Sequence, residues 1–425
     1  MPFIDVEKFV KKDDSPLIFI SAGDPSGDVH AARLVQILSQ KIPNAQIVGY
    51  AGGKTAATCC NVFFDLTQYA VMMLKKALLN LPNYIKLLKQ TDDFFRKFRP
   101  DIVILVDFPS FNWKIAQKAK KIGASTVYFM PPQIWGWGQW RVKKMRKYVD
   151  LVLSCFSFEN DWFKARDCRS TLVGHPFFEE ARSRKIDENF LESLQQDRRP
   201  YLTLLPGSRN QEVTNNLPLL LTIVDKVLKA VPDVQPVFAA FNESQANYID
   251  EKVKEKGLNF PVYAKKTPEL LRGATCCLGV SGSVSIELLS LLKPTVIVYK
   301  ISKIEHFALR FLKKVKYITL TNLLYVDSLE GETPFYPARF LPKTTEHTPR
   351  ERELMLFPEF ITYEDCSDEA AKPLIDWFQN DARRSEVVNK MKNLKELTDF
   401  VENPIDLASD RIIDVLRSKE RERKE

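Results

Sequence analysis

A chain of 425 residues is too long for one ordinary hydrophobic core, and 45% hydrophobic with 27% charged residues is typical of a globular protein with two or three domains. The formal net charge of +8 is spread along the chain, which disfavours nucleic acid as a partner and fits an anionic substrate or membrane surface. Seven cysteines without a Cys-x-x-Cys motif, and only four histidines, indicate neither a disulfide framework nor a metal centre. We expect no signal peptide, and no apolar stretch approaches the roughly 20 residues that span a bilayer.

Strand-like runs rich in Ile, Val, Leu and Phe alternate with helix-like stretches, which is typical of βαβ units and a parallel sheet. The expected strands of the first half are 17–21, 46–50, 102–106, 126–129, 151–155 and 171–173, and those of the second half are 201–205, 235–239, 262–264, 276–279 and 295–299. The sequence therefore predicts an α/β protein with two doubly wound, Rossmann-like domains that face each other across a cleft.

The first domain is expected at residues 1–178 and the second at residues 200–380, with a polar linker at 178–200. Pro, Thr, Glu and Arg dominate residues 327–358, which predicts a surface loop or insertion in the second domain. Helical patterning returns at residues 367–380 and 385–401.

A turn of small and acidic residues, Ser21–His30, follows the first strand. Ligands of open α/β sheets bind outside the carboxyl ends of the strands, so Asp24 and Ser26 in the bend are expected to face the cleft. Asp28 is expected to cap the following helix instead.

Asp107 follows five apolar residues at the carboxyl end of an expected strand. A half-buried carboxylate there has a raised pKa and is suited to act as a general base, but a carboxylate that caps the next helix would look the same. Two other features of the sequence also allow both a functional and a structural interpretation. Trp135–Trp137 would contact a sugar or an acyl chain, or form a rigid aromatic plug, and His175 would orient a sugar or phosphate, or bond the backbone.

Two turns in the second half each follow an apolar run. Pro206-Gly207 is expected to leave backbone amides without hydrogen-bond partners just before Arg209. The guanidinium of Arg209 has several hydrogen-bond donors in one plane. In the other turn, Leu278–Glu287, a helix beginning near Ser283 would direct unpaired amides at a phosphate, and Glu287 would accept hydrogen bonds from sugar hydroxyls. Each turn alone is weak evidence, but together they predict a site for a nucleoside diphosphate.

Two stretches interleave large apolar residues with basic ones, Val71–Lys89 and His306–Lys316. Such segments rest in the lipid headgroup region, although core-facing helices with solvated lysines have the same pattern. We expect salt to release the protein from anionic vesicles only in part, because apolar contact at Val71–Leu88 would persist.

Seven segments in one order resemble lipid-A-disaccharide synthases, the inverting glycosyltransferases of family 19, which have the GT-B fold. They are Ala22–Asp28, Val106–Asn112, Trp135–Trp137, Val173–Pro176, Leu205–Arg209 with Glu212, Ser281–Glu287 and Tyr317–Leu324. The resemblance runs from about Leu17 to Leu324 and resumes weakly from Phe357 to Val415.

The resemblance implies the donor UDP-2,3-diacylglucosamine and the acceptor 2,3-diacylglucosamine 1-phosphate, which give a β-1′,6-linked disaccharide 1-phosphate and UDP in lipid A biosynthesis. It also implies a cytoplasmic enzyme held peripherally on the inner membrane, with no metal and no cofactor. Dimers are known in the family, so a homodimer is one expected assembly. The helices within 381–425 would pack back on the first domain or on a partner.

In this family's chemistry, Asp107 would be the catalytic base, and Asp24 and Ser26 would arrange the reacting sugars. Asp24 stands where the family usually has Glu, which puts a direct catalytic role for it in doubt. The residues expected to bind UDP or substrate are Gly207, Ser208, Arg209, Glu212, Ser281, Gly282, Ser283, Glu287, His175 and Asn322.

Three other functions compete with this interpretation. One is another GT-B enzyme that uses a UDP-sugar, such as a UDP-N-acetylglucosamine 2-epimerase or a muramyl-lipid transferase; the Asp107 and Trp135–Trp137 segments argue against it. A second is a non-catalytic lipid- or nucleotide-binding relative, which the retained Asp107, Arg209 and Glu287 disfavour. An NAD-dependent enzyme is disfavoured because the Gly-x-Gly-x-x-Gly fingerprint is missing.

Overall fold

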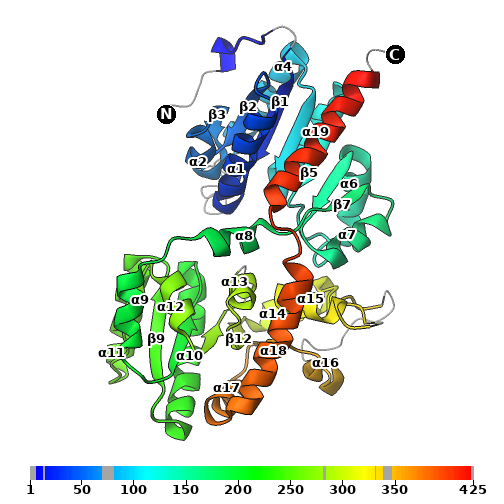
Figure 1. The fold of residues 1–425 in the computed structure, drawn as a ribbon. Helices are drawn as coiled ribbons and strands as arrows, with labels where there is room; N and C mark the ends of the chain where they lie inside the picture. Colours follow the sequence, from blue (N-terminus) through cyan, green and yellow to red (C-terminus); the bar gives the residue numbers. More distant parts are fainter. Residues whose placement is uncertain are drawn as a thin grey trace. The chain divides into compact units, whose positions relative to one another are not determined.

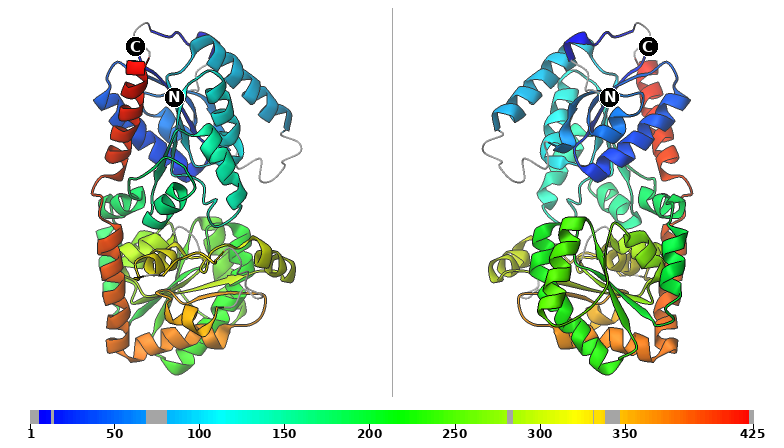
Figure 2. Two further views of the ribbon diagram at one scale, coloured as in Figure 1. Left: turned by 90° about the vertical axis from the view of Figure 1, so that its right-hand side faces the viewer. Right: turned by 90° about the vertical axis from the view of Figure 1, so that its left-hand side faces the viewer.

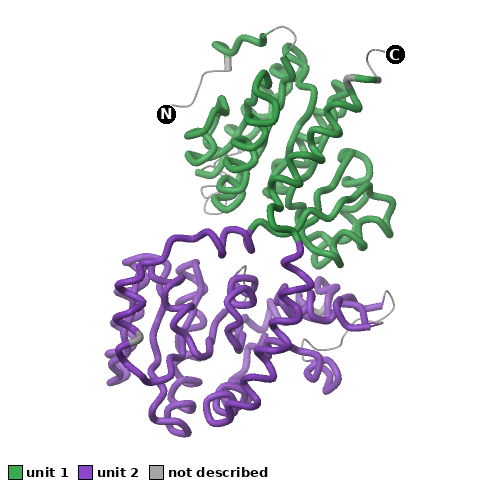
Figure 3. Tube along the Cα trace, in the orientation of Figure 1, with its two compact units in different colours: residues 1–176, 401–425 green, residues 177–400 purple. Residues whose placement is uncertain are grey.

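The computed structural model describes residues 6–12, 15–68, 81–280, 284–330, 332–337 and 347–422. Contacts divide the chain into two compact units, residues 1–176 with 401–425 and residues 177–400 (Figure 3). The chain therefore leaves the first unit after residue 176 and returns to it at residue 401. Helix α18 (Asp381–Thr398) belongs to the second unit and helix α19 (Pro404–Glu422) to the first.

The first unit contains a seven-stranded parallel sheet in the order β3-β2-β1-β4-β5-β6-β7. Its strands are β1 (Leu17–Ala22), β2 (Gln46–Ala51), β3 (Asn61–Asp65), β4 (Ile102–Val106), β5 (Ser125–Phe129), β6 (Leu151–Ser154) and β7 (Ser170–Leu172). Every residue of β1 and β4 is buried, which is expected of central parallel strands covered on both faces.

Helices pack on both faces of this sheet (Figures 1 and 2). Ile18 and Ile20 of β1 pack in one core with α1 and α19, whereas Phe19 between them points to the other face and contacts Phe94 and Phe95 of α4. The helices of this unit are α1 (Pro25–Lys41), α2 (Gly53–Ala56), α4 (Leu81–Phe98), α5 (Pro109–Lys121), α6 (Val142–Tyr148), α7 (Ser157–Lys164) and α19.

The C-terminal helix α19 is part of the core of the first unit. Its buried residues include Ile405, Ala408 and Ile412, which join the cluster formed by α1 and the sheet. Lys41 at the end of α1 also makes salt bridges with Asp406 and Asp410, at 2.9 and 2.6 Å. The first unit therefore needs the last residues of the chain to cover its sheet.

The second unit contains a six-stranded parallel sheet in the order β10-β9-β8-β11-β12-β13. Its strands are β8 (Tyr201–Leu205), β9 (Gln235–Ala240), β10 (Val262–Ala264), β11 (Cys276–Gly279), β12 (Thr295–Lys300) and β13 (Glu359–Thr362). Its helices are α8 (Pro176–Ser183), α9 (Glu188–Gln195), α10 (Asn210–Ala230), α11 (Glu243–Glu255), α12 (Thr267–Gly273), α13 (Val284–Ser290), α14 (Lys303–Leu312), α15 (Leu320–Asp327), α16 (Pro349–Glu353), α17 (Ser367–Gln379) and α18.

Two segments differ from their expected character. The expected linker at 178–200 holds most of α8 and all of α9, and the carboxylate of Asp187 caps α9 by accepting from the amide of Phe190. The described part of residues 327–358 is not simply a surface loop, because it contains α16 and the buried side chains of Leu356 and Phe357.

Candidate functional site

The strand order of the first unit reverses between β1 and β4, which are hydrogen-bonded neighbours. In open parallel sheets, a crevice forms at the carboxyl ends of the two strands at such a switch point. Asp24 lies two residues after β1, and Asp107 directly follows β4. The fold therefore brings both expected catalytic carboxylates to the position where α/β proteins bind ligands.

The backbone at Asp107 is held in an uncommon conformation. Asp107 and Phe108 have φ angles of 46° and 42°, in the left-handed region that costs non-glycine residues about 1–3 kcal/mol each. A Cβ atom on Gly23 would lie 2.1 Å from the ring of Phe108, so only glycine fits beside this bend. Strain of this kind persists where the surrounding structure enforces it, as at active sites.

Buried hydrogen bonds enforce this conformation. The side-chain amide of Asn112 donates to the carbonyl oxygens of Asp107 (2.7 Å), Val106 and Ser21 (both 3.2 Å), and the Ser21 hydroxyl donates to Oδ1 of Asn112 at 2.6 Å. The Tyr128 hydroxyl donates to the carbonyl of Asp107 at 2.7 Å. Asn112 and Tyr128 are fully buried, so these bonds fix the strand end from inside the core.

The carboxyl group of Asp107 has a raised proton affinity. Burial and, to a smaller extent, the carboxylate of Asp24 raise its pKa to about 6, although a hydrogen bond from the amide of Phe108 acts in the opposite direction. A carboxylate with a pKa near neutrality is suited to accept a proton in a reaction at physiological pH.

The structure separates the three polar residues of the first turn. Asp24 precedes α1, and its side chain does not cap that helix, while Ser26 is exposed in the first helical turn. The buried carboxylate of Asp28 accepts hydrogen bonds from the amides of Gly52, Lys54 and Thr55. The prediction that Asp28 caps the helix following this turn is wrong, because Asp28 lies inside α1 and its carboxylate binds amides at the start of α2.

Trp135 is buried in the first unit, whereas His175 is half-buried. The His175 ring stacks on Phe156 with 5.0 Å between centroids, and burial lowers its pKa to about 3. The Trp135 indole donates to the carboxyl of Glu159 at 3.0 Å, and burial raises the pKa of Glu159 to about 7. Trp135 thus has a packing role, and ligand contact by His175 stays a prediction.

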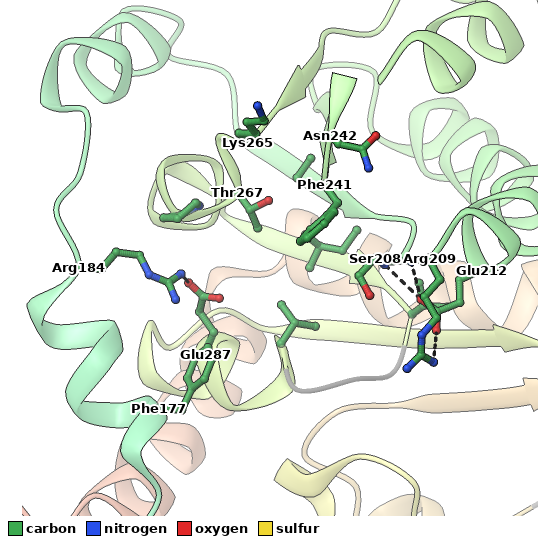
Figure 4. Close-up of a pocket in the computed structure, with 16 residues that line it drawn as sticks. Phe177, Arg184, Ser208, Arg209, Glu212, Phe241, Asn242, Lys265, Thr267 and Glu287 are labelled. Carbon is green, nitrogen blue, oxygen red and sulfur yellow. Dashed lines mark hydrogen bonds and ion pairs between the residues drawn. The ribbon is translucent and has the colours of Figure 1, made fainter. Parts of the chain in front are cut away.

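The second unit contains a cavity of about 800 Å³ at the carboxyl ends of its strands (Figure 4). Of the residues expected to bind UDP, it brings together Gly207, Ser208, Arg209, Glu212 and Glu287. Its other lining residues with polar or aromatic side chains are Phe177, Arg184, Phe241, Asn242, Lys265 and Thr267. One pocket therefore combines cations, a buried carboxylate and two aromatic rings.

The turn before α10 differs from the expectation of bare amides. The carboxylate of Glu212 accepts from the amides of Ser208 and Arg209, at 3.1 and 3.2 Å. Gly207 has a φ of 118°, and a Cβ atom there would lie 2.7 Å from that of Glu212. The amides are occupied by Glu212, whereas the Arg209 side chain is 78% exposed in the pocket and only 3.3 Å from Oε1 of Glu212.

Glu287 lies on the opposite side of the pocket from Arg209 (Figure 4). Its Oε1 atom is 2.7 Å from Nη1 of Arg184, and its pKa is raised by burial and lowered by that guanidinium. Arg184 was not predicted, because residues 178–200 were expected to form a linker. Phe241 was not predicted either, although it directly follows β9 and strand ends border the ligand site.

Asn322 is fully buried away from the pocket lining. Its side-chain amide donates to the carbonyl of Phe357 at 2.7 Å and to Glu359 at 3.1 Å, and its Oδ1 accepts from the amides of Leu356 and Phe357. These bonds give Asn322 a structural role, and direct contact with a ligand stays a prediction. Ser281, Gly282 and Ser283 lie outside the described residues.

Comparisons with known proteins identify the family. The family model described as lipid-A-disaccharide synthetase matches residues 18–334. The chain is 30% identical to a lipid-A-disaccharide synthase of Myxococcus xanthus over 73% of this chain and 81% of that protein, and 28% identical to lipid-A-disaccharide synthase 1 of Legionella pneumophila over 89% and 92%.

Similarity to a solved structure supports the fold of this chain but says nothing of its function. The putative UDP-N-acetylglucosamine 2-epimerase of Listeria monocytogenes matches 96% of this chain and 97% of its own, with a TM-score of 0.58 at 13% identity. Two parallel α/β sheets and neighbours of this kind confirm the expected GT-B class. The chain belongs to the lipid-A-disaccharide synthase family, the glycosyltransferases of lipid A biosynthesis.

Proposed function

We propose that the pocket of the second unit binds the UDP group of UDP-2,3-diacylglucosamine and that Asp107 deprotonates the 6-hydroxyl of 2,3-diacylglucosamine 1-phosphate. The observation that carries this proposal is the carboxyl of Asp107, held on a strained bend at the strand switch point with its pKa raised to about 6. Membership of the family supplies the class of reaction.

The proposed reaction is a single inverting displacement. The carboxylate of Asp107 takes the proton of the acceptor hydroxyl while its oxygen forms a bond to C1 of the donor sugar. The bond from C1 to the β-phosphate oxygen breaks on the opposite face, and its electron pair leaves with UDP. Arg209 would stabilise the negative charge that develops on the leaving diphosphate.

Asp24 would act mainly through Asp107. Its carboxylate helps to raise the pKa of Asp107, so it keeps that group a stronger base than an isolated aspartate. This electrostatic role does not need the longer reach of the glutamate usual in the family. Ser26, exposed in the first turn of α1, would help to arrange the sugars.

Turnover with defined substrates tests the proposed function. Purified protein would be incubated with both diacyl sugars, and UDP release and product mass would be followed. We expect one UDP per tetraacyl disaccharide 1-phosphate. UDP release without the disaccharide, or epimerised UDP-sugar in its place, would contradict the proposal.

We further propose that the protein sits in the cytoplasm on the inner-membrane surface. No helix among the described residues is long and apolar enough to cross a bilayer. Helix α14, which overlaps the basic-apolar stretch at residues 306–312, exposes Ile304, Phe307 and Phe311 at a spacing that places them on one face of the helix. Residues 71–80 of the other stretch lie outside the described residues.

Replacing Phe307 and Phe311 with serine is expected to weaken vesicle binding at least tenfold, because two large apolar side chains would no longer enter the lipid headgroup region. Sedimentation with vesicles containing anionic lipid measures this change, and we expect salt to release the wild type only in part. Leu397→Ser is the matched control, since Leu397 is 62% exposed on α18. Unchanged binding of the double variant would remove α14 from this role.

The expected homodimer stays a prediction. Sedimentation equilibrium of the purified protein would test it, with a molecular mass near 98 kDa expected for two chains of 49.0 kDa each.

A further inference from the structure

Arg184 reaches the pocket of the second unit from the segment that follows α8. Its Nη1 atom lies 2.7 Å from Oε1 of Glu287, and its Nη2 atom lies 2.9 Å from Oε1 of Glu180. The guanidinium also lies over the Phe177 ring, 5.7 Å from its centroid. Figure 4 shows Arg184 and Glu287 pointing toward each other. One planar group therefore links carboxylates of two helices, α8 and α13.

The ionisation of Glu287 depends on Arg184 more than that of an exposed carboxylate would. Its side chain is only 9% exposed, against 27% for Arg184. Burial opposes ionisation of Glu287, the charge of Glu180 opposes it as well, and Arg184 favours it. The other charged groups lining the pocket are Arg209, Glu212 and Lys265, and Lys395 of the packed helix α18 binds the carbonyl of Ser290 at the end of α13.

The position of the carboxylate is fixed as well as its charge. An arginine that donates to two acceptors through separate nitrogens holds both at a set separation and orientation, which a lysine, as a point charge, does not. Arg184 therefore fixes Glu287 at the pocket wall and favours its ionised form, which receives hydrogen bonds from neighbouring hydroxyls.

We propose that Arg184 is a positioning residue for nucleotide binding, which holds Glu287 so that its carboxylate accepts hydrogen bonds from the vicinal hydroxyls of a ribose. This inference rests on the proposed binding of UDP in the same pocket. Arg184 acts through Glu287 and needs no contact of its own with the nucleotide.

Calorimetric titration with UDP and with 2′,3′-dideoxy-UDP tests the proposal. Arg184→Ala is expected to weaken UDP binding about tenfold, the effect of losing a hydrogen bond to a charged group. The affinity for dideoxy-UDP is expected to stay within twofold of wild type, because that ligand lacks the hydroxyls. Lys185→Ala is the matched control, since Lys185 is an exposed cation next to Arg184 that does not line the pocket.

The pH dependence gives a second readout. Without Arg184 the pKa of Glu287 rises further, so a larger fraction of the carboxyl is protonated as the pH falls. The affinity of Arg184→Ala for UDP is therefore expected to drop from pH 8 to pH 5.5 more steeply than that of wild type. Arg184→Lys restores the charge and is expected to recover part of the affinity and the flatter profile; it also keeps the test readable if the alanine variant does not fold.

Three results would contradict the proposed positioning role of Arg184. They are wild-type UDP affinity in Arg184→Ala, an equal loss for UDP and dideoxy-UDP, and a lysine variant that behaves like the alanine variant at every pH. A wild-type protein that binds neither ligand would instead overturn the proposed function itself.

Discussion

Replacing Asp107 with asparagine is expected to lower kcat by about 10²–10⁴, the contribution of a well-placed general base, while the affinity for UDP stays close to wild type. Asparagine keeps the shape of the side chain but cannot accept the proton of the acceptor hydroxyl. Turnover of the two diacyl sugars and a separate titration with UDP measure the two quantities. Asp161→Asn, at an exposed carboxylate on α7, is the control.

The same role predicts the pH dependence of the wild type. Burial and Asp24 raise the pKa of Asp107 to about 6, and only the deprotonated carboxylate is a base. We therefore expect kcat to be close to its maximum above pH 7 and to fall about tenfold per pH unit well below pH 6. An Asp107→Asn variant with near-normal turnover would remove Asp107 from catalysis, whatever the wild-type profile.

Replacing Arg209 with alanine is expected to lower kcat by about 10²–10³ and to weaken UDP binding as well, because the guanidinium would stabilise charge that grows on the leaving diphosphate. The Arg209 side chain is largely exposed in the pocket and bound to Glu212 at 3.3 Å, so it is available to a ligand without unfolding the turn. Single-turnover rates and UDP titration separate the two effects.

Arg209→Lys is expected to recover only part of the loss, because a lysine cannot form the two parallel hydrogen bonds of a guanidinium. Arg198→Ala serves as the control, since Arg198 is exposed before β8 and does not line the pocket. If Arg209→Ala bound UDP and turned over like this control, the diphosphate would lie elsewhere.

The central strands of both sheets were predictable because they are continuous apolar runs. Strand β4 has the predicted bounds, Ile102–Val106, and the expected strands at 201–205 and 276–279 also agree with β8 and β11. Of the four outermost strands, β7 and β10 were predicted, whereas β3 and β13 were missed. Strand β13 is only four residues long and begins with Glu359, whose buried carboxylate accepts from the amides of Ile318 and Thr319. A strand that begins with a charged residue lacks the continuous apolar run by which strands were predicted. The backbone amides that bind this carboxylate are far away in the sequence.

The candidate site was predictable only where a residue follows a strand. Asp107, Arg209 and Glu287 were found from strand–turn–helix patterns, because the carboxyl ends of parallel strands share one edge of a sheet. That Glu212 occupies the amides before α10 could not be inferred, since glutamate three residues into a helix also reads as an ordinary surface residue. Arg184 belongs to a polar segment without a strand, so only the fold brings it to Glu287.

We propose above that the protein binds UDP in the pocket of its second unit, and a crystal structure with UDP bound would test this directly. We expect a diphosphate oxygen within hydrogen-bonding distance of the Arg209 guanidinium and both ribose hydroxyls hydrogen-bonded to the carboxylate of Glu287. UDP bound outside this pocket, or with its ribose turned away from Glu287, would contradict it.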